Sequence, residues 1–357
     1  MIQLEFLGYG PFFSAQLELL ARPELVAARI GADAQDVFPL VGCDAPFGEV
    51  TGKLRQAMEA RQSERPVAGD WVAVTLHGDR AAIHAVLGRR TQLQRRAAGS
   101  DALAQTVAAN VDVYFVVTAT GRDLNPRRLE RYLTAVWNSG ASPVIVLNKT
   151  DLVDEIESST HRIELVAPAV PIIAASAHTG SGVELLREHL GPGITGAFVG
   201  SSGVGKSSLV NRLLGEHRQP IASVGVDGRG SHTTTRRELV LLNSGGILID
   251  TPGLREFGVL DTGRGLDITF ADIAGFAQGC RFRDCSHTDE PGCAVLEAVA
   301  QEALPRERLE SYRRLQKEAA AAEARRNPTM ANNPKRRWKA VKNSLRQYLK
   351  SRDKRED

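Results

Sequence analysis

The stretch Gly200-Ser-Ser-Gly-Val-Gly-Lys-Ser-Ser208 decides the fold of the centre of this chain. It matches the phosphate-binding pattern G-x-x-x-x-G-K-[ST], and it lies between an expected strand at 196–200 and an expected helix, as that pattern requires. The alternative, a chance Gly/Ser loop before a helix, is disfavoured by this setting. The stretch therefore predicts a site for a nucleoside triphosphate.

Different residues of this loop are expected to contact the phosphates and Mg²⁺. Gly203 and Gly205 let the backbone wrap a phosphate without Cβ clashes, so that amides and the helix N-terminus face the anion. Lys206 is expected to reach the β and γ phosphates, and the Ser207 hydroxyl is expected to ligate Mg²⁺. The predicted nucleotide contacts in the loop are Gly200, Ser201, Ser202, Gly203, Val204, Gly205, Lys206, Ser207 and Ser208.

Apolar strands surround the loop in the sequence, and a helix is expected at 127–137. Continuous apolar strands separated by helices are typical of a parallel sheet covered on both faces. We therefore expect an α/β domain around the loop. Its expected strands cover 111–117, 143–147, 171–175, 196–200, 239–242 and 247–249.

The stretch Asn148-Lys-Thr-Asp151 predicts which base is bound. It follows the strand at 143–147, at the carboxyl end where open parallel sheets bind ligands. The Asp151 carboxylate can accept from both N1–H and the exocyclic amine of guanine, whereas adenine has no such donor pair on that edge. Lys149 is expected to lie along the base plane and Asn148 to tie the base loop to the phosphate loop, with Thr150 in the same contact set.

Ser176-Ala177 follows the next strand, at 171–175, and is expected to present a backbone amide to guanine O6. As a dipeptide it carries no information by itself. Asn-Lys-x-Asp alone also fits an ordinary polar turn after a strand. The prediction of a guanine site from these two stretches is stronger because both lie at the ends of neighbouring expected strands.

Asp250-Thr-Pro-Gly253 ends the strand at 247–249. Asp250 is expected to hold Mg²⁺ through water, and the Gly253 amide is expected to sense the γ-phosphate. A threonine that closes over Mg²⁺ is offered by Thr233, Thr234 and Thr235, among which we favour Thr234. Because five such fragments each lie at the appropriate end of a strand, the interpretation is a GTPase.

The order of these fragments is unusual for a GTPase, because Asn148 and Ser176 precede Gly200. A circular permutation allows the same sheet to form, since chain termini usually lie near each other at the surface. Residue 254 is Leu, where Ras-like GTPases have a nearby Gln that orients the attacking water. Leu254 has no polar group for that task, so we expect slow intrinsic hydrolysis that needs an external activator.

Cys280-x4-Cys285-x-His287-x5-Cys293 is a set of three cysteines and one histidine within fourteen residues. Soft thiolates plus imidazole in a tetrahedral set suit Zn²⁺ and leave no position for catalysis, so a single structural Zn²⁺ is expected. The alternative is buried free thiols with an incidental histidine, which the compact spacing disfavours. Cys43 is remote and fits an ordinary small apolar side chain.

The first ninety residues favour a small β-barrel or sandwich, because short apolar stretches alternate with turn signals. The expected strands are 37–41, 48–54, 70–76 and 80–87.

Composition and charge narrow the class of protein. The 357 residues are 42% hydrophobic and 24% charged, which is ordinary globular composition. Apolar runs such as 113–117 are far shorter than the roughly 20 residues of a membrane span, and the start lacks a signal-peptide pattern. We therefore expect a soluble cytoplasmic protein that does not bind membranes.

The C-terminal tail from Lys335 to Arg355 holds ten Lys or Arg and one acid, a charge of +9 that leaves −6 for the remainder of the +3 chain. This asymmetry favours an anionic partner, with nucleic acid first. Trp338 and Tyr348 lie among the basic residues, which permits stacking on bases as well as phosphate contact.

The chain resembles the ribosome small-subunit-dependent GTPases, a family called RsgA, YjeQ or YloQ, over nearly its whole length. Besides the permuted GTPase fragments and the Cys/His set, the resemblance rests on the stretches 50–55, 66–74, 108–112 and Arg128-Leu-Glu-Arg-Tyr132. The chain departs from the family pattern in one place. Some members have Trp-His shortly after the segment that corresponds to Asp250–Gly253, where this chain has Leu260-Asp261.

The resemblance implies three domains: an OB-fold RNA-binding domain at 1–96, a circularly permuted GTPase domain at 97–271, and a zinc-binding domain with a basic helical tail at 272–357. It implies a monomer that binds GTP or GDP, the small ribosomal subunit and its rRNA, and that hydrolyses GTP during late subunit maturation with stimulation by the subunit. The alternative is an rRNA-binding module that holds GTP as a structural ligand with negligible turnover.

Overall fold

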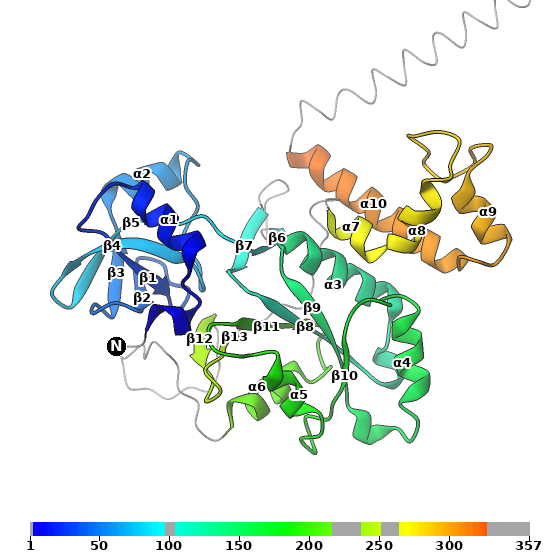
Figure 1. Cartoon of the computed structure of the whole chain (residues 1–357), viewed down its shortest axis with the longest axis horizontal. Helices are drawn as coiled ribbons and strands as arrows, with labels where there is room; N and C mark the ends of the chain where they lie inside the picture. The colour runs from blue at the N-terminus through cyan, green and yellow to red at the C-terminus, as the bar shows by residue number, and fades with distance from the viewer. Residues whose placement is uncertain (1–2, 97–103, 216–236, 251–263, 327–357) are drawn as a thin grey trace, which may run out of the picture.

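The computed structural model describes residues 3–96, 104–215, 237–250 and 264–326. In Figure 1 these residues form a barrel at the N-terminal end, a central sheet with helices on both faces, and a group of C-terminal helices. No helix within these four ranges is long and apolar enough to cross a bilayer. The Thr233–Thr235 group, Gly253, Leu254 and the basic tail fall outside the described residues.

The N-terminal barrel is closed in the strand order β1-β2-β3-β5-β4, with β1 pairing β4 to complete it. Only β3 and β5 are parallel, and the order confirms the expected OB-fold. The strands are β1 Val26–Ile30, β2 Val37–Val41, β3 Phe47–Val50, β4 Trp71–His77 and β5 Arg80–Val86.

Helices in this barrel domain correct the all-β expectation. The strand expected at 48–54 ends at Val50, because Thr51 caps a helix by accepting a hydrogen bond from the Leu54 amide at 3.3 Å. The helices are α1 Pro11–Leu19, α2 Gly52–Glu59 and a 3₁₀ turn at Leu4–Leu7.

The central sheet has six strands in the order β10-β9-β8-β11-β13-β12. All neighbours are parallel except β12 and β13, an antiparallel edge that the expectation of a parallel sheet did not include. The strands are β8 Val113–Ala119, β9 Ser142–Asn148, β10 Ile172–Ala174, β11 Thr195–Gly200, β12 Glu238–Leu241 and β13 Ile247–Asp250.

Both faces of this sheet are buried, as neighbouring residues of β8 show. Tyr114 belongs to a core with α3 and α4, whereas Phe115 belongs to a core with α5 and α6. Successive side chains of a strand point to opposite faces, so a strand covered on both sides is apolar throughout. The helices are α3 Pro126–Ser139, α4 Glu157–Glu164, α5 Val183–Glu188 and α6 Lys206–Leu214, with 3₁₀ turns at Gly121–Asp123 and Thr150–Leu152.

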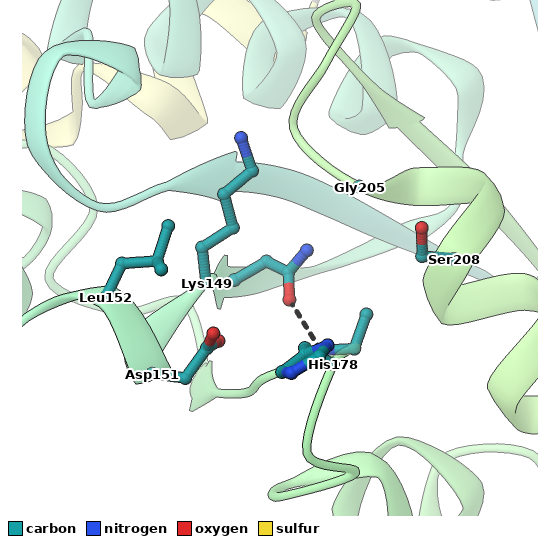
Figure 2. A pocket seen from close by; sticks show the side chains of 8 residues that line it. Lys149, Asp151, Leu152, His178, Gly205 and Ser208 are labelled. Carbon is teal, nitrogen blue, oxygen red and sulfur yellow. Dashed lines mark hydrogen bonds between the residues drawn. The ribbon is translucent and has the colours of Figure 1, made fainter.

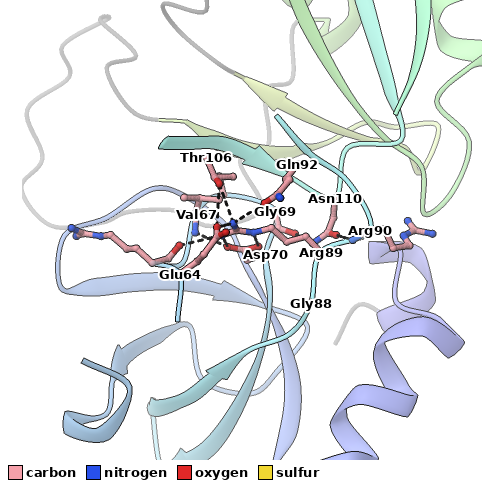
Figure 3. Close-up of polar contacts among 12 residues, drawn as sticks. Glu64, Val67, Gly69, Asp70, Gly88, Arg89, Arg90, Gln92, Thr106 and Asn110 are labelled. Carbon is pink, nitrogen blue, oxygen red and sulfur yellow. Dashed lines mark hydrogen bonds and ion pairs between the residues drawn. The ribbon is translucent and has the colours of Figure 1, made fainter. Parts of the chain in front are cut away.

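A two-stranded antiparallel sheet, β6 Gln92–Arg96 and β7 Ala104–Ala109, connects the barrel to the central sheet. Beside it, buried Asp70 of the barrel receives two hydrogen bonds from Arg89, at 2.7 and 2.8 Å, and Arg89 also donates to Thr106 of β7 (Figure 3). The core on the α3 face continues without a break into the barrel, through Phe13 and Trp71.

The C-terminal helices pack on α3, which covers one face of the central sheet (Figure 1). They have a separate core that includes Leu266, Phe270 and Leu309. Gly265 allows a close helix crossing, because a Cβ there would lie 2.4 Å from the Thr134 carbonyl oxygen of α3. The helices are α7 Arg264–Thr269, α8 Ala271–Ala277, α9 Ala294–Ala300 and α10 Arg306–Arg326. The two domain boundaries, at 96/97 and 271/272, remain predictions.

Candidate nucleotide and metal sites

The predicted phosphate loop joins β11 to α6, as the motif requires. β11 ends at Gly200 and α6 begins at Lys206. Gly203 and Gly205 have φ angles of +82° and +93°, in the region that side chains avoid. At Gly205 space is also limiting, because a Cβ would lie 2.2 Å from Nδ2 of Asn148.

Asn148 connects the phosphate loop to both base loops. This side chain is 1% exposed at the end of β9. Its Nδ2 donates to the Val204 carbonyl at 2.8 Å, and its Oδ1 accepts from the Ala177 amide at 3.0 Å. One amide group thus joins its own loop to two segments that are 29 and 56 residues from it in the sequence.

A cavity of about 390 Å³ lies where these three segments meet. In Figure 2, side chains from the base loops and from the start of α6 surround it. Its lining residues are Asn148, Lys149, Asp151, Leu152, Ala177, His178, Gly205 and Ser208. Leu152 and His178 were not predicted as part of this site, because neither belongs to a pattern that can be read from one sequence.

Asp151 is fixed as an ionised acceptor at the edge of this cavity. The Ser176 hydroxyl donates to Oδ1 of Asp151, and the Thr179 amide donates to the Ser176 oxygen at 3.1 Å. The hydrogen bond from Ser176 lowers the pKa of Asp151 below its usual range. A carboxylate held in this way has its second oxygen available to a donor pair on a ligand.

The other base-loop residues occupy defined positions. Lys149 has a φ of +63°, and its Nζ lies 3.6 Å from Oδ2 of Asp123. The Thr150 hydroxyl donates to the Ala175 carbonyl at 3.0 Å, which holds the loop after β9 against β10. The backbone turn at Lys149 therefore projects its side chain along the cavity while Thr150 anchors the loop.

Lys206 folds back over the phosphate loop. Its Nζ donates to the carbonyls of Gly200 at 2.7 Å and Ser201 at 2.5 Å. Ser202 and Ser207 are exposed, and half-buried Asp250 ends β13, the strand next to β11. These groups gather at the carboxyl ends of adjacent parallel strands, where ligands of open sheets bind. Thr234 and Gly253 lie outside the described residues.

Arg128 belongs to a stretch that carries the family resemblance, but the sequence did not place it at this site. Its Nη1 donates to the Ser201 hydroxyl at 2.8 Å, from the first turn of α3. The two residues are 73 positions apart, so the contact depends on the packing of α3 against β8, the strand that pairs with β11.

Cys280, Cys285, His287 and Cys293 come together as predicted, with their ligand atoms within 4.8 Å of one another. Nδ1 of His287 lies 3.6 Å from Sγ of Cys280 and 3.4 Å from Sγ of Cys293, and the two sulfurs are 3.8 Å apart. A tetrahedral Zn²⁺ with bonds of about 2.3 Å to sulfur and about 2.0 Å to nitrogen requires edges of about 3.8 and 3.5 Å. The donor set and its spacing therefore fit Zn²⁺.

Comparison with protein families gives two matches. A model described as RsgA GTPase matches residues 86–260. A model described as 50S ribosome-binding GTPase matches residues 195–355. Both matches include the phosphate loop.

Curated proteins with similar sequences cover most of the chain. A Methanosarcina acetivorans protein named small ribosomal subunit biogenesis GTPase RsgA is 44% identical over 329 residues, which are 91% of this chain and 88% of that protein. A Listeria innocua protein, small ribosomal subunit biogenesis GTPase RsgA 1, is 39% identical over 353 residues, 99% of both chains.

Two solved structures have a similar fold. YjeQ from Thermotoga maritima has a TM-score of 0.61 and 26% identity, and the match covers 83% of this chain and 99% of that one. YloQ, described as a circularly permuted GTPase, has a TM-score of 0.58 and 22% identity, with 84% of this chain and 96% of that one covered. At 22% identity, the match to YloQ shows a similar fold and nothing about activity.

Proposed function

Because the chain belongs to the RsgA GTPase family, we propose that it binds the small ribosomal subunit and hydrolyses GTP to GDP and phosphate during late subunit maturation. The subunit stimulates this hydrolysis. The Methanosarcina acetivorans and Listeria innocua relatives match over 88% and 99% of their own length, which supports transfer of the whole activity.

The observation that carries the proposal is the position of Asn148. In the sequence its motif lies before the phosphate loop, yet its side chain bonds both Val204 of that loop and Ala177 of the second base loop. A circular permutation explains this arrangement, because the strands keep their spatial neighbours while their order along the chain changes. The three segments form one site of a size suited to a nucleotide base.

Each residue at the site receives a role within this proposal. Asp151 pairs with guanine, Lys149 covers the base plane, and the Ala177 amide faces guanine O6. Lys206 leaves its two carbonyl partners to bind the β and γ phosphates. These assignments combine side-chain geometry with the ordinary chemistry of phosphate-loop GTPases.

Mg²⁺ and the switch residues complete the proposed site. Ser207 and Asp250 hold Mg²⁺, the second through water. Thr234 is our choice for the closing threonine, and Gly253 for the γ-phosphate contact. The remaining proposed nucleotide contacts are Asn148, Thr150, Ser176, Gly200, Ser201, Ser202, Gly203, Val204, Gly205 and Ser208.

The domains have separate roles in the proposal. The barrel at 1–96 and the basic tail bind rRNA, the segment 97–271 binds and hydrolyses GTP, and the segment 272–357 holds a structural Zn²⁺. Lys53, Arg55 and Arg61 are exposed on the barrel domain, which supports contact with an anionic surface. We further propose that the protein is a cytoplasmic monomer.

The test is GTP turnover by the purified chain with and without purified small subunits. We expect a low basal rate that rises when subunits are added. Asp151→Asn serves as the matched negative variant, because loss of the carboxylate leaves the donor pair of guanine without its acceptor. Subunit binding with GTP bound but no turnover above background would instead support the rRNA-binding module.

A further inference from the structure

Arg128 places a positive charge against the phosphate loop. Helix α3 begins at Pro126, and the Asn125 side chain caps it by accepting from the Arg128 amide at 3.1 Å. This cap fixes the backbone of Arg128 at the end of α3 that faces β11. From there the guanidinium reaches Ser201, the second residue of the loop, with an Nη1–Oγ distance of 2.8 Å.

The partners of neighbouring arginines differ from that of Arg128. Arg127 pairs with Glu310 at 3.2 Å, and Arg131 pairs with Glu318 at 2.8 Å, both on α10. Among the described residues, no carboxylate lies within ion-pair distance of Arg128, whose side-chain contact is a neutral hydroxyl. The hydroxyl positions the guanidinium without cancelling its charge, so that charge remains available to an anion.

The same loop residue is also bound by the phosphate-loop lysine. Nζ of Lys206 lies 2.5 Å from the Ser201 carbonyl, while Arg128 holds the Ser201 hydroxyl. Lysines at this position of a phosphate loop reach the β and γ phosphates. A guanidinium bound to the same residue is therefore within one side-chain movement of the end of the site where the γ-phosphate is expected.

We propose that Arg128 is a catalytic arginine supplied within the chain, which moves from Ser201 to the γ-phosphate and stabilises the charge of the transition state. The inference rests on the proposed function. In the step it assists, a water oxygen bonds to the γ-phosphorus, and the bond from phosphorus to the bridging oxygen breaks. The bridging electron pair stays on GDP, and the proton of the water leaves with the phosphate or to solvent.

A catalytic role for Arg128 is consistent with the residue that follows Asp250–Gly253 in the sequence. Leu254 stands where a glutamine would orient water, and a hydrophobic side chain supplies no charge to the transferring group. Arginine binds phosphate oxygens in a planar, bidentate manner, and its contribution is greatest when charge develops there.

The experiment compares Arg128→Ala, Arg128→Lys and the matched control Arg127→Ala in the full chain. Arg127 has the same side chain, is the adjacent residue of α3 and is also exposed, but it points to Glu310 of α10. We expect Arg128→Ala to lower kcat of subunit-stimulated hydrolysis on the order of 10²–10³-fold with KM nearly unchanged. Arg128→Lys is expected to recover part of the rate, and Arg127→Ala to retain it.

A second readout separates a catalytic from a structural role. GDP with aluminium fluoride imitates the transferring phosphoryl group, so Arg128→Ala is expected to lose binding of this complex while it binds GDP alone like the parent. Equal kcat for Arg128→Ala and Arg127→Ala overturns the inference and leaves the proposed function standing. A parent chain with no turnover on subunits overturns both.

Discussion

The barrel and the C-terminal helices are both attached to the central sheet region by a buried arginine, but the two arginines have different partners. Arg29 of the barrel is 1% exposed, and its hydrogen bonds to described residues all go to carbonyl oxygens, those of Leu7 at 2.6 Å and of Gly69 and Asn110 at 3.2 Å. Arg308 of α10 is 4% exposed and pairs with two carboxylates, those of Glu130 and Asp272.

Arg308 joins three helices. It bonds Glu130 of α3 at 2.7 Å and both carboxylate oxygens of Asp272 on α8, at 2.7 and 3.1 Å. It also donates to the Thr269 carbonyl at 2.7 Å and lies 4.5 Å from the ring centroid of Phe270. Buried Ser311 donates to the other oxygen of Glu130, so that carboxylate is fully bonded.

The two environments shift the arginine pKa values in opposite directions. Burial lowers the pKa of Arg29 to about 10, which still leaves it protonated at neutral pH. Burial also lowers the pKa of Arg308, but hydrogen bonds and charge attraction from Asp272 and Glu130 outweigh this and raise it. For Glu130 burial dominates and raises the carboxyl pKa despite Ser311 and Arg308.

The barrel and the C-terminal helices are attached to the central sheet region by different kinds of contact. The barrel shares a continuous apolar core with the sheet, and Arg29 adds bonds between segments within that core. The C-terminal helices have their own core, so their attachment depends more on the charged contact with α3 and on the metal ligands. The C-terminal attachment also meets α3, the helix that carries Arg128.

The largest effect is expected from metal removal. Chelation or Cys285→Ala is expected to unfold the segment around the Cys/His set and spare the barrel and GTP binding, because structural Zn²⁺ contributes about 10–16 kcal/mol to the folding of zinc-finger peptides. Hydrogen exchange monitored by mass spectrometry measures this region by region. Cys43→Ala is the control, since Cys43 lies in the barrel domain away from the other three cysteines. Unchanged protection after exhaustive chelation would refute a structural metal.

The next effect is expected from Arg308→Ala. Removal of one partner leaves Glu130 as an uncompensated buried charge, and the cost of breaking such a pair is about 3–5 kcal/mol. Urea denaturation followed by limited proteolysis of the C-terminal helices measures the loss. The control is Arg314→Ala on the same helix, whose exposed pair with Glu318 at 3.4 Å is worth less than about 1 kcal/mol. Similar losses for the two variants would contradict the assignment of Arg308 as the main polar attachment.

The smallest effect is expected from Arg29→Met, which replaces the buried charge by an apolar side chain of similar length. We expect a loss of about 1–3 kcal/mol, because buried carbonyls lose a donor while no carboxylate is left unpaired. The Gly69 carbonyl keeps a second donor, Nδ2 of Asn110 at 3.1 Å. Urea denaturation of this variant beside Arg308→Ala tests the comparison directly, and a larger loss for Arg29→Met would reverse it.

The sequence by itself determined the chemistry that depends on contiguous residues. The phosphate loop, the Asn148–Asp151 stretch and the Cys/His set were each predicted, because their residue types and spacing suit a ligand before any packing is known. The alternation of buried strands and helices likewise indicated the α/β domain. In the barrel, the expected strand at 48–54 was partly wrong, because a helix cap at Thr51 overrides the apolar pattern that follows it.

Contacts between side chains that are far apart in the sequence became known from the tertiary structure. Arg128 reaches Ser201 across 73 residues, and Arg308 reaches Glu130 across 178. Arg29 bonds three carbonyls, which every residue type possesses and which therefore leave no trace in the sequence. A buried charge is stabilised by whatever polar atoms the packing brings near it, so its partners become known when the helices and strands are placed in space.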